Sequence, residues 1–373
     1  MLNNITLFIV LIILGISTIT QLVYYWFIYS KVAFFNPENE YTREDEPVSI
    51  IICARNEYYN LSKNLPLILD QDYSSFEVVV INHGSDDDTA YLLRDFSERH
   101  KNLKVVNVPE DLNFFTGKKF PLSIGIKSAS NDILLFTDAD CYPLSNLWLR
   151  NMASNFVPKT EIVLGYGAYD VEPSMVNKLI HFDTMRVAMN YLSFALIGMP
   201  YMGVGRNMAY RKSLFYKQNG FISHYHIKSG DDDLFVNKAA TKNNTRIEIR
   251  SGAYTISEPK KTLSQWIRQK RRHLLTGVEY KAKHKFALSL FGATQVIFWI
   301  TALFLGIMLY QPFVVGGLFL ARLLSQLIVC KKVMQKLSEK GFLLLIPIFE
   351  VFIIVVTPVL SILNVFNPIK KWK

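Results

Sequence analysis

The sequence predicts an α/β domain with a mostly parallel sheet, flanked by transmembrane helices. Long apolar segments occupy both ends of the 373-residue chain, whereas its middle part has the mixed composition of a soluble domain. Within that middle part, short β-branched apolar runs alternate with stretches of helical spacing. Polar clusters follow several of these runs, where ligands bind in sheets of this class.

The first predicted element is a transmembrane helix over residues 1–30. Leu2–Tyr29 contains no charged side chain and exceeds the ~20 apolar residues that span a bilayer core. A cleaved signal peptide is the alternative. It fits less well, because no basic residue precedes the apolar run and no small-x-small cleavage site follows it.

The soluble body, predicted over residues 45–285, begins with apolar runs typical of buried strands. They are Pro47–Cys53, Glu77–Ile81, Leu103–Val108 and Ile133–Phe136. Helical spacing lies between them, in Tyr91–His100 and Lys118–Lys127. Strands that alternate with helices of this length predict a mostly parallel sheet with both faces covered.

Polar residues follow three of these strands. Residues 54–57 follow the first, 82–89 the second and 137–140 the fourth. We expect the three clusters to meet in one crevice, because ligands bind beyond the carboxyl ends of parallel strands. Each cluster alone is compatible with a turn or a helix cap, as Ser85 and Asp88 illustrate. Their joint placement is what indicates a site.

Asp138 and Asp140 are the predicted metal ligands. In an extended segment, side chains at i and i+2 face the same way, so both carboxylates can bind one cation. Hard oxygen ligands suit Mg²⁺ or Mn²⁺, which would act as a Lewis acid toward a leaving diphosphate. A simple Asp turn at the strand end is the alternative.

A second acidic cluster, Asp231-Asp232-Asp233, follows Gly230. Three consecutive acids could cap the helix that is expected to begin near Leu234. Crowded carboxylates also raise the pKa of at least one member, which gives the base that an acceptor hydroxyl needs. We assign Asp232 as this base, with Asp231 as the alternative.

A basic stretch, Gln265–His273, precedes the apolar run Phe286–Leu309. It is typical of a solvated or membrane-facing helix, or of a phosphate site in which Arg271 or Arg272 binds the pyrophosphate. Much of the net charge of +10 lies here and in the adjacent lysines. The positive-inside rule therefore places the body in the cytoplasm, beside anionic lipid. Nucleic-acid binding is not expected, because no recognition motif accompanies these charges.

The remaining apolar segments predict a transmembrane bundle over residues 286–366. The candidate spans are Phe286–Leu309, Phe313–Cys330 and Phe342–Phe366. The number of crossings stays open. Three crossings would place the last lysines outside the cytoplasm, whereas a re-entrant last segment, broken by its prolines, would keep the lysine clusters inside. Met175–Met199, an apolar helix in the body, is either core or an interfacial helix at the acceptor entry.

Taken in order, these motifs resemble the membrane-bound family 2 glycosyltransferases with a GT-A fold. That group is similar to ceramide glucosyltransferases and to bacterial exopolysaccharide or glycolipid synthases. The resemblance covers residues 45–285 and rests on six motifs: ARNE, SxDxT, GK, DxD, an acidic GDD and QxxR before a membrane span. It implies a nucleotide-sugar-binding half at 45–145 and an acceptor half at 146–285 with a basic interfacial helix.

The resemblance implies that residues in these motifs contact the nucleotide-sugar. In chain order they are Ala54, Arg55, Glu57, Asn82, His83, Asp87, Lys118, Asp138, Gln269 and Arg272. It also implies that Asp138 and Asp140 hold Mg²⁺ or Mn²⁺, and that Asp232 is the base. Two positions depart from the pattern. His83 replaces an acidic residue, which leaves UDP and GDP both open, and His273 replaces the tryptophan of QxxRW, which argues against processive synthesis.

We therefore expect an inverting, metal-dependent hexosyltransferase in the inner membrane, with its catalytic domain in the cytoplasm. It would move a sugar from a UDP- or GDP-sugar to a lipid or lipid-linked glycan by direct displacement, with a base on one side and cationic groups on the other. The alternatives are a processive polysaccharide synthase and a nucleotide-sugar-binding membrane protein without turnover.

Overall fold

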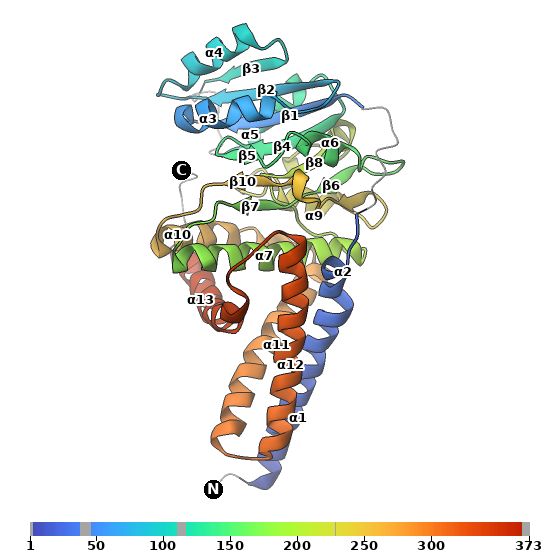
Figure 1. Ribbon diagram of the computed structural model, residues 1–373, viewed down its shortest axis with the longest axis vertical. Helices are drawn as coiled ribbons and strands as arrows, with labels where there is room; N and C mark the ends of the chain where they lie inside the picture. The colour runs from blue at the N-terminus through green and yellow to red at the C-terminus, as the bar shows by residue number, and fades with distance from the viewer. Residues whose placement is uncertain (1–2, 38–45, 110–116, 228, 368–373) are drawn as a thin grey trace.

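The structure, a computed structural model, describes residues 3–37, 46–109, 117–227 and 229–367. A sheet domain lies at one end of the molecule and a bundle of long helices at the other (Figure 1). Helices α7 (Met175–Leu196) and α10 (Leu263–Leu274) lie across the molecule between the two parts.

A seven-stranded sheet forms the centre of the domain, in the order β3-β2-β1-β4-β8-β6-β9. The strands are β1 Val48–Ala54, β2 Phe76–His83, β3 Leu103–Val108, β4 Ile133–Asp138, β6 Ile162–Leu164, β8 Met208–Arg211 and β9 Thr245–Ile247. β3, β2, β1 and β4 are parallel to one another, and β8 runs antiparallel between β4 and β6. All seven residues of β1 are buried, as in a central strand covered on both faces. The predicted α/β domain with a mostly parallel sheet is confirmed.

Helices α3 (Tyr58–Leu69), α4 (Thr89–Arg99) and α5 (Lys119–Ser128) connect the parallel strands. A second sheet lies between the first sheet and α7 (Figure 1), in the order β5 (Cys141–Pro143), β10 (Thr255–Ser257) and β7 (Gly167–Tyr169). The sequence did not predict this sheet, because strands of three residues are too short to show an alternating pattern.

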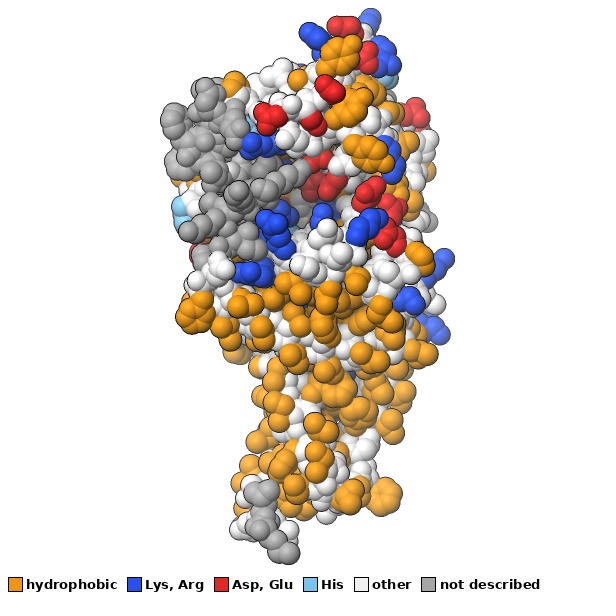
Figure 2. Space-filling view, turned by 90° about the vertical axis from the view of Figure 1, so that its left-hand side faces the viewer, with side chains coloured by type: hydrophobic (Ala, Val, Ile, Leu, Met, Phe, Trp, Pro, Cys, Tyr) orange, Lys and Arg blue, Asp and Glu red, His pale blue; other side chains and the backbone are white. Residues whose placement is uncertain are grey.

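Among the residues that the structure describes, four helices are long and apolar enough to cross a membrane: Asn4–Ala33, Ala282–Ile307, Pro312–Lys336 and Leu343–Phe366. The first comprises α1 (Asn4–Val23), a π-helical segment (Tyr24–Tyr29) and α2 (Ser30–Ala33). It runs beside α11 (Ala282–Ile307) and α12 (Pro312–Lys336), away from the sheet domain (Figure 1). On the face shown in Figure 2 these helices carry mostly hydrophobic side chains, and lysines and arginines lie just above them.

Helix α13 (Ile346–Phe366) lies at the junction, against α7 and α10 (Figure 1). The Phe349 ring is 5.7 Å from that of Phe182 on α7, and further along α13 the Phe352 ring is 6.1 Å from that of Trp266 on α10. At the far end, the Asn364 side chain donates to a backbone carbonyl of α10 at 2.7 Å. Helix α13 is continuous through Pro358 and belongs to a segment long and apolar enough to cross a membrane, so the number of crossings stays open.

Helix α7 is enclosed by protein on almost all sides. Its apolar residues, including Met185 and Met189, are buried in the main core, so Met175–Met199 fits the core interpretation rather than that of an interfacial helix. Three buried polar side chains of α7 pair with other elements, as burial of polar groups requires. The pairs are Asp183–Lys270 of α10, His181–Glu339 after α12 and Asn190–Tyr29 of the first helix, at 2.7, 2.6 and 2.9 Å.

A buried polar cluster joins all four long helices. Arg322 of α12 forms an ion pair with Glu350 of α13, and the side chains of both residues are at most 3% exposed. Glutamines complete the cluster: Gln21 accepts from Arg322 at 2.9 Å, Gln326 accepts from it at 2.7 Å, and Gln295 donates to Glu350 at 2.6 Å. Charged side chains buried among apolar helices destabilise the fold unless each is paired and hydrogen-bonded.

Replacing Arg322 or Glu350 singly by Met should destabilise the protein in detergent by about 3–5 kcal/mol, because the partner stays buried and unpaired. The double Met variant should regain most of that loss, since it leaves neither charge. Thermal unfolding of the purified variants measures this, with Leu324→Met on the exposed face of α12 as the control. Additive losses in the double variant would contradict the pairing.

Candidate active site

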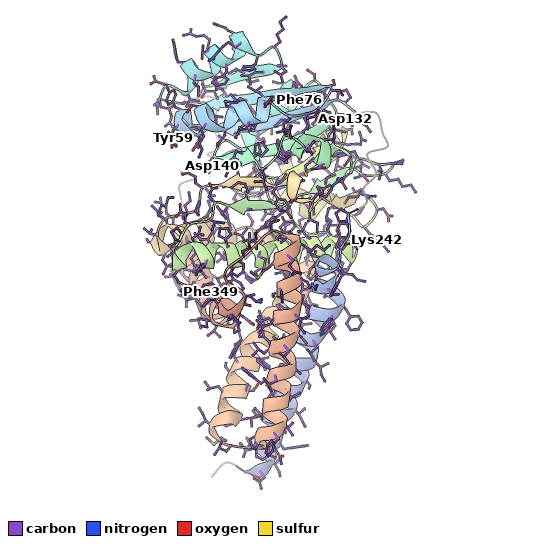
Figure 3. All side chains as sticks on the ribbon, in the orientation of Figure 1. Tyr59, Phe76, Asp132, Asp140, Lys242 and Phe349 are labelled. Carbon is purple, nitrogen blue, oxygen red and sulfur yellow. The ribbon has the colours of Figure 1, made fainter. Side chains whose placement is uncertain are left out.

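The strand register brings the three predicted polar clusters to one edge of the sheet. Ala54 at the end of β1 is level with Asn82 of β2, and Cys53 is level with Asp138 of β4. The carboxyl ends of the three strands therefore meet, as expected from the parallel arrangement. Asp140 lies at this edge, on the side that faces α10 (Figure 3).

The loop after β2 holds the loop after β1 in place. The backbone N–H of Asn56 donates to Ser85 at 3.0 Å, and that of Tyr58 donates to the Asp87 carboxylate at 3.2 Å. Burial would raise the pKa of Asp87, but hydrogen bonds from Thr89 and Tyr58 outweigh it and lower that pKa. Asp87 thus shapes the loop, and its predicted contact with the nucleotide-sugar stays a prediction.

Buried polar side chains lie at the end of β2, beside β3. The Asn82 side chain is 6% exposed and donates to Asn107 at 3.0 Å, while its own Oδ1 accepts nothing from the residues that the structure describes. His83, beside it, is also buried. An unpaired buried carbonyl oxygen is suited to accept a hydrogen bond from a bound ligand. Of the other predicted contacts here, Glu57 is buried and Arg55 is half-buried.

Lys118 connects the two acidic clusters. Its ammonium group bonds to Asp138 and lies 3.8 Å from the Asp231 carboxylate. Burial would lower the pKa of Lys118, but these two carboxylates raise it above its usual value, so the lysine stays charged. The structure therefore places the acidic residues after β4 and those before α9 (Asp233–Ala239) around one cation.

The residues at the end of β4 fit a divalent cation. Ligand atoms of Asp138, Asp140 and Cys141 lie within 4.8 Å of one another. The Cys141 thiol is a poor ligand, because burial raises its pKa and it is already paired with Ser257 at 3.0 Å. Two hard carboxylates remain, which suits Mg²⁺ or Mn²⁺ with further ligands from phosphate and water. Burial and the nearby Asp138 and Glu57 raise the pKa of Asp140, a repulsion that a cation would relieve.

Asp232 has the properties of a general base. Its two carboxylate oxygens accept from the backbone N–H groups of Gly205 and Asp233, both at 2.8 Å. Burial, followed by the charges of Asp231 and Asp233, raises the pKa of Asp232 to about 8. A carboxylate this basic, held by two backbone bonds, can accept a proton near neutral pH.

Asp233 has a different role within the triplet. Its side chain is buried and accepts from the hydroxyl groups of Thr276 and, at 2.7 Å, Tyr280. Both partners lie in the connection between α10 and α11, and Tyr280 is two residues before α11 begins. Asp233 therefore ties the acidic triplet to the start of a candidate membrane span.

The second sheet adds an arginine that the sequence did not single out. Arg206 places its guanidinium 4.3 Å from the centre of the Tyr169 ring on β7 and donates to the Gly167 carbonyl. The Tyr169 hydroxyl in turn accepts from the predicted contact Gln269 at 3.2 Å. Arg206 lies between α7 and β8, away from the strand ends that drew attention in the sequence, so only its proximity in space reveals it.

The structure separates the two arginines that were expected to bind pyrophosphate. Burial would raise the pKa of Asp138, but the charges of Lys118, Arg206 and Arg272 lower it, so Arg272 lies within electrostatic reach of the acidic edge. Arg271 points elsewhere, because its Nε donates to Asn364 of α13 at 2.9 Å. Arg271 is thus engaged with α13, and its predicted contact with the nucleotide stays a prediction.

The chain is similar to several known proteins. Residues 49–217 match the family described as glycosyl transferase family 2. Glycosyltransferase AglE of Haloferax volcanii is 35% identical over 109 residues, which are 29% of this chain and 34% of that protein. A poly-β-1,6-N-acetyl-D-glucosamine synthase of Staphylococcus epidermidis is 32% identical over 125 residues, 31% of this chain and 29% of that protein. The matches thus span about a third of the length of these relatives.

Among solved structures, the mannosyltransferase PcManGT of Pyrobaculum calidifontis, in complex with GDP-Man and Mn²⁺, is similar to the chain. The similarity has a TM-score of 0.58 at 18% identity and covers 94% of this chain and 99% of that one. At this identity the likeness concerns the fold, and it confirms the expected GT-A architecture.

Substitutions of Arg271 and Arg272 should differ in their effect on nucleotide affinity. Arg272→Ala should weaken binding of UDP or GDP with Mn²⁺ by roughly tenfold or more, because a hydrogen bond to a charged group contributes about 1.5–3 kcal/mol. Arg271→Ala, the matched control on the same helix, should leave binding within about twofold of the wild type. Calorimetric titration measures both, and equal losses in the two variants would contradict this assignment.

Proposed function

Since residues 49–217 form a family 2 glycosyltransferase domain, we propose that this enzyme is inverting and metal-dependent and moves a sugar from a UDP- or GDP-sugar to a lipid-associated acceptor. The transfer takes place at the cytoplasmic face of a membrane. The chain divides into a transmembrane helix (residues 1–30), the catalytic domain (45–285) and a transmembrane bundle (286–366). The observation that carries the proposal is the cluster of Asp138, Lys118, Asp231 and Asp232 at one sheet edge.

The cluster provides both sides of a direct displacement. Asp232 takes the proton of the acceptor hydroxyl as its oxygen attacks the anomeric carbon, and the bond from that carbon to the nucleotide diphosphate breaks. Lys118 and Arg272 supply positive charge beside the leaving phosphates. Mg²⁺ or Mn²⁺ held by Asp138 and Asp140 would supply further charge neutralisation there. Attack opposite the leaving group inverts the anomeric centre.

A lipid acceptor is supported by the position of the base. Asp232 adjoins Asp233, whose hydrogen bond to Tyr280 anchors the triplet two residues before α11 begins. The base therefore lies beside the point where the chain enters the apolar bundle. A hydroxyl carried by a lipid headgroup or a lipid-linked glycan reaches this position from the membrane surface.

The distribution of lysines supports the proposed orientation. Lys281, Lys283 and Lys285 lie at the body end of α11, and α12 ends at Lys336, which bonds to Asn36 at 2.9 Å. The turn between α11 and α12, residues 308–311, carries no Lys or Arg. Positive residues thus gather at the body end of the bundle, which supports a cytoplasmic body in the inner membrane.

A processive polysaccharide synthase is the second candidate. Its support is the similarity to the Staphylococcus epidermidis protein that is named a poly-β-1,6-N-acetyl-D-glucosamine synthase. His273 at the tryptophan position of QxxRW, and an α13 that packs against the body, favour single transfers instead. The length of the carbohydrate product distinguishes the two.

Nucleotide release by the detergent-purified protein tests the proposal. UDP- and GDP-sugars are supplied with Mn²⁺, Mg²⁺ or EDTA, with and without lipid extract. We expect metal-dependent release from one donor that lipid stimulates and Asp232→Asn reduces by about 10²–10⁴-fold, as for loss of a general base. The control is Asp70→Asn, because Asp70 is exposed and lies at the C-terminal end of α3, whereas the loop after β1 lies at its N-terminal end. Full activity in EDTA would contradict the metal site, and full activity of Asp232→Asn would contradict the base.

The pH profile tests the base separately. Asp232 acts when deprotonated and its pKa is raised to about 8, so kcat/KM should rise with pH up to about 8. Below that pH it should fall about tenfold per unit. Steady-state rates between pH 6 and 9.5 measure this, and a flat profile would contradict the assignment.

A further inference from the structure

Lys119 is a buried lysine that the mechanism above does not use. It is the first residue of α5, directly after Lys118, and its side chain is 4% exposed. Its ammonium group donates to the backbone carbonyls of His224 at 2.5 Å and Ile227 at 2.8 Å. The two hydrogen bonds to backbone carbonyls stabilise this charge, because a buried charge without such partners is costly.

The backbone that Lys119 holds leads directly to the acidic triplet. His224 ends a 3₁₀ turn, and Gly230 immediately precedes Asp231. Gly230 has a φ of +93°, and a Cβ there would lie 2.5 Å from the side chain of Leu234. A side chain at position 230 is therefore disfavoured both by the backbone conformation and by Leu234.

Lys119 also acts on the triplet through its charge. Burial lowers the pKa of Lys119 to about 8, while Asp231, Asp233 and Asp232 raise it. This attraction is mutual, so the ammonium group favours the deprotonated form of the carboxylates. The other titratable groups near the triplet are Lys118 of α5, Tyr210 of β8, Tyr280 before α11 and His224, whose pKa burial and Lys119 lower to about 4.

We propose that Lys119 is a positioning residue, which sets both the place and the charge of Asp232 for removal of the acceptor proton. It acts on the turn of residues 222–227 and on the field around the triplet, without contact to donor or acceptor. The two neighbouring lysines then have separate roles. Lys118 pairs with Asp138, on the side where the donor binds, and Lys119 positions the base Asp232. The inference rests on Asp232 as the base under the proposed function.

The test compares Lys119→Met, Lys119→Arg and Lys127→Met with the wild type. Lys127 is an exposed residue on the same helix and serves as the control. Met keeps the length of the side chain but removes the charge and both hydrogen bonds. Rates of nucleotide release are measured from pH 6 to 9.5 with the active donor and Mn²⁺, and binding of UDP or GDP reports folding.

Lys119→Met should lower kcat roughly 10- to 100-fold, as expected for a misplaced catalytic group, with nucleotide binding within about twofold of the wild type. Its ascending pH limb should move to higher pH, because Asp232 loses a neighbouring positive charge. In the wild type, activity should decline at the alkaline end as Lys119 loses its proton. Lys119→Arg keeps its charge at all these pH values and should abolish that decline.

Three outcomes would overturn the inference. They are a kcat of Lys119→Met within twofold of the wild type, a lower kcat with an unshifted ascending limb, and an alkaline decline in Lys119→Arg that matches that of the wild type. If Lys119→Met loses nucleotide binding, the variant is misfolded, and the pH profile of Lys119→Arg decides. Failure of the proposed function would give a different result. Asp232→Asn would then keep full turnover, regardless of how the Lys119 variants behave.

Discussion

The burial of α7 is the constraint on which the rest of the structure depends. This helix lies between a sheet domain and an apolar bundle, so its buried polar side chains must find partners within the protein. Asp183 finds Lys270 on α10, and His181 finds Glu339 after α12. Each pairing fixes one membrane-side element against the catalytic domain. The pair of Asp183 and Lys270 holds α10 against α7.

The second constraint is electrostatic. The parallel strands bring carboxylates to one edge, and the acidic triplet adds more negative charge beside them. Lys118 offsets this charge while leaving the Asp232 pKa raised. The compensation is incomplete, so the cluster keeps a basic carboxylate that a fully neutralised cluster would lack.

The catalytic and membrane parts share residues rather than a simple linker. Asp233 lies next to the candidate base and also bonds to Tyr280 near the start of α11. On the other side, the turn after α12 inserts Glu339 beneath β7, where Tyr166 donates to it. Two hydrogen-bonded contacts thus join the bundle to the sheet domain.

The sequence by itself determined the local features. Apolar runs predicted β1 to β4, and the residues at the ends of three of them predicted the polar clusters, because a parallel sheet brings carboxyl ends together. It also identified the four apolar helices by length and composition. These properties depend on residues near one another in the chain.

The tertiary structure decided what depends on distant partners. Gln265–His273 predicts a helix, but only the docking of α13 decides that Arg271 faces Asn364. Arg206 acquires a role only through the second sheet, whose strands are too short to detect in the sequence. The placement of α13 was open for a similar reason. An apolar helix can bury its surface equally well against lipid or against protein, and only the facing surfaces of α7 and α10 select between them.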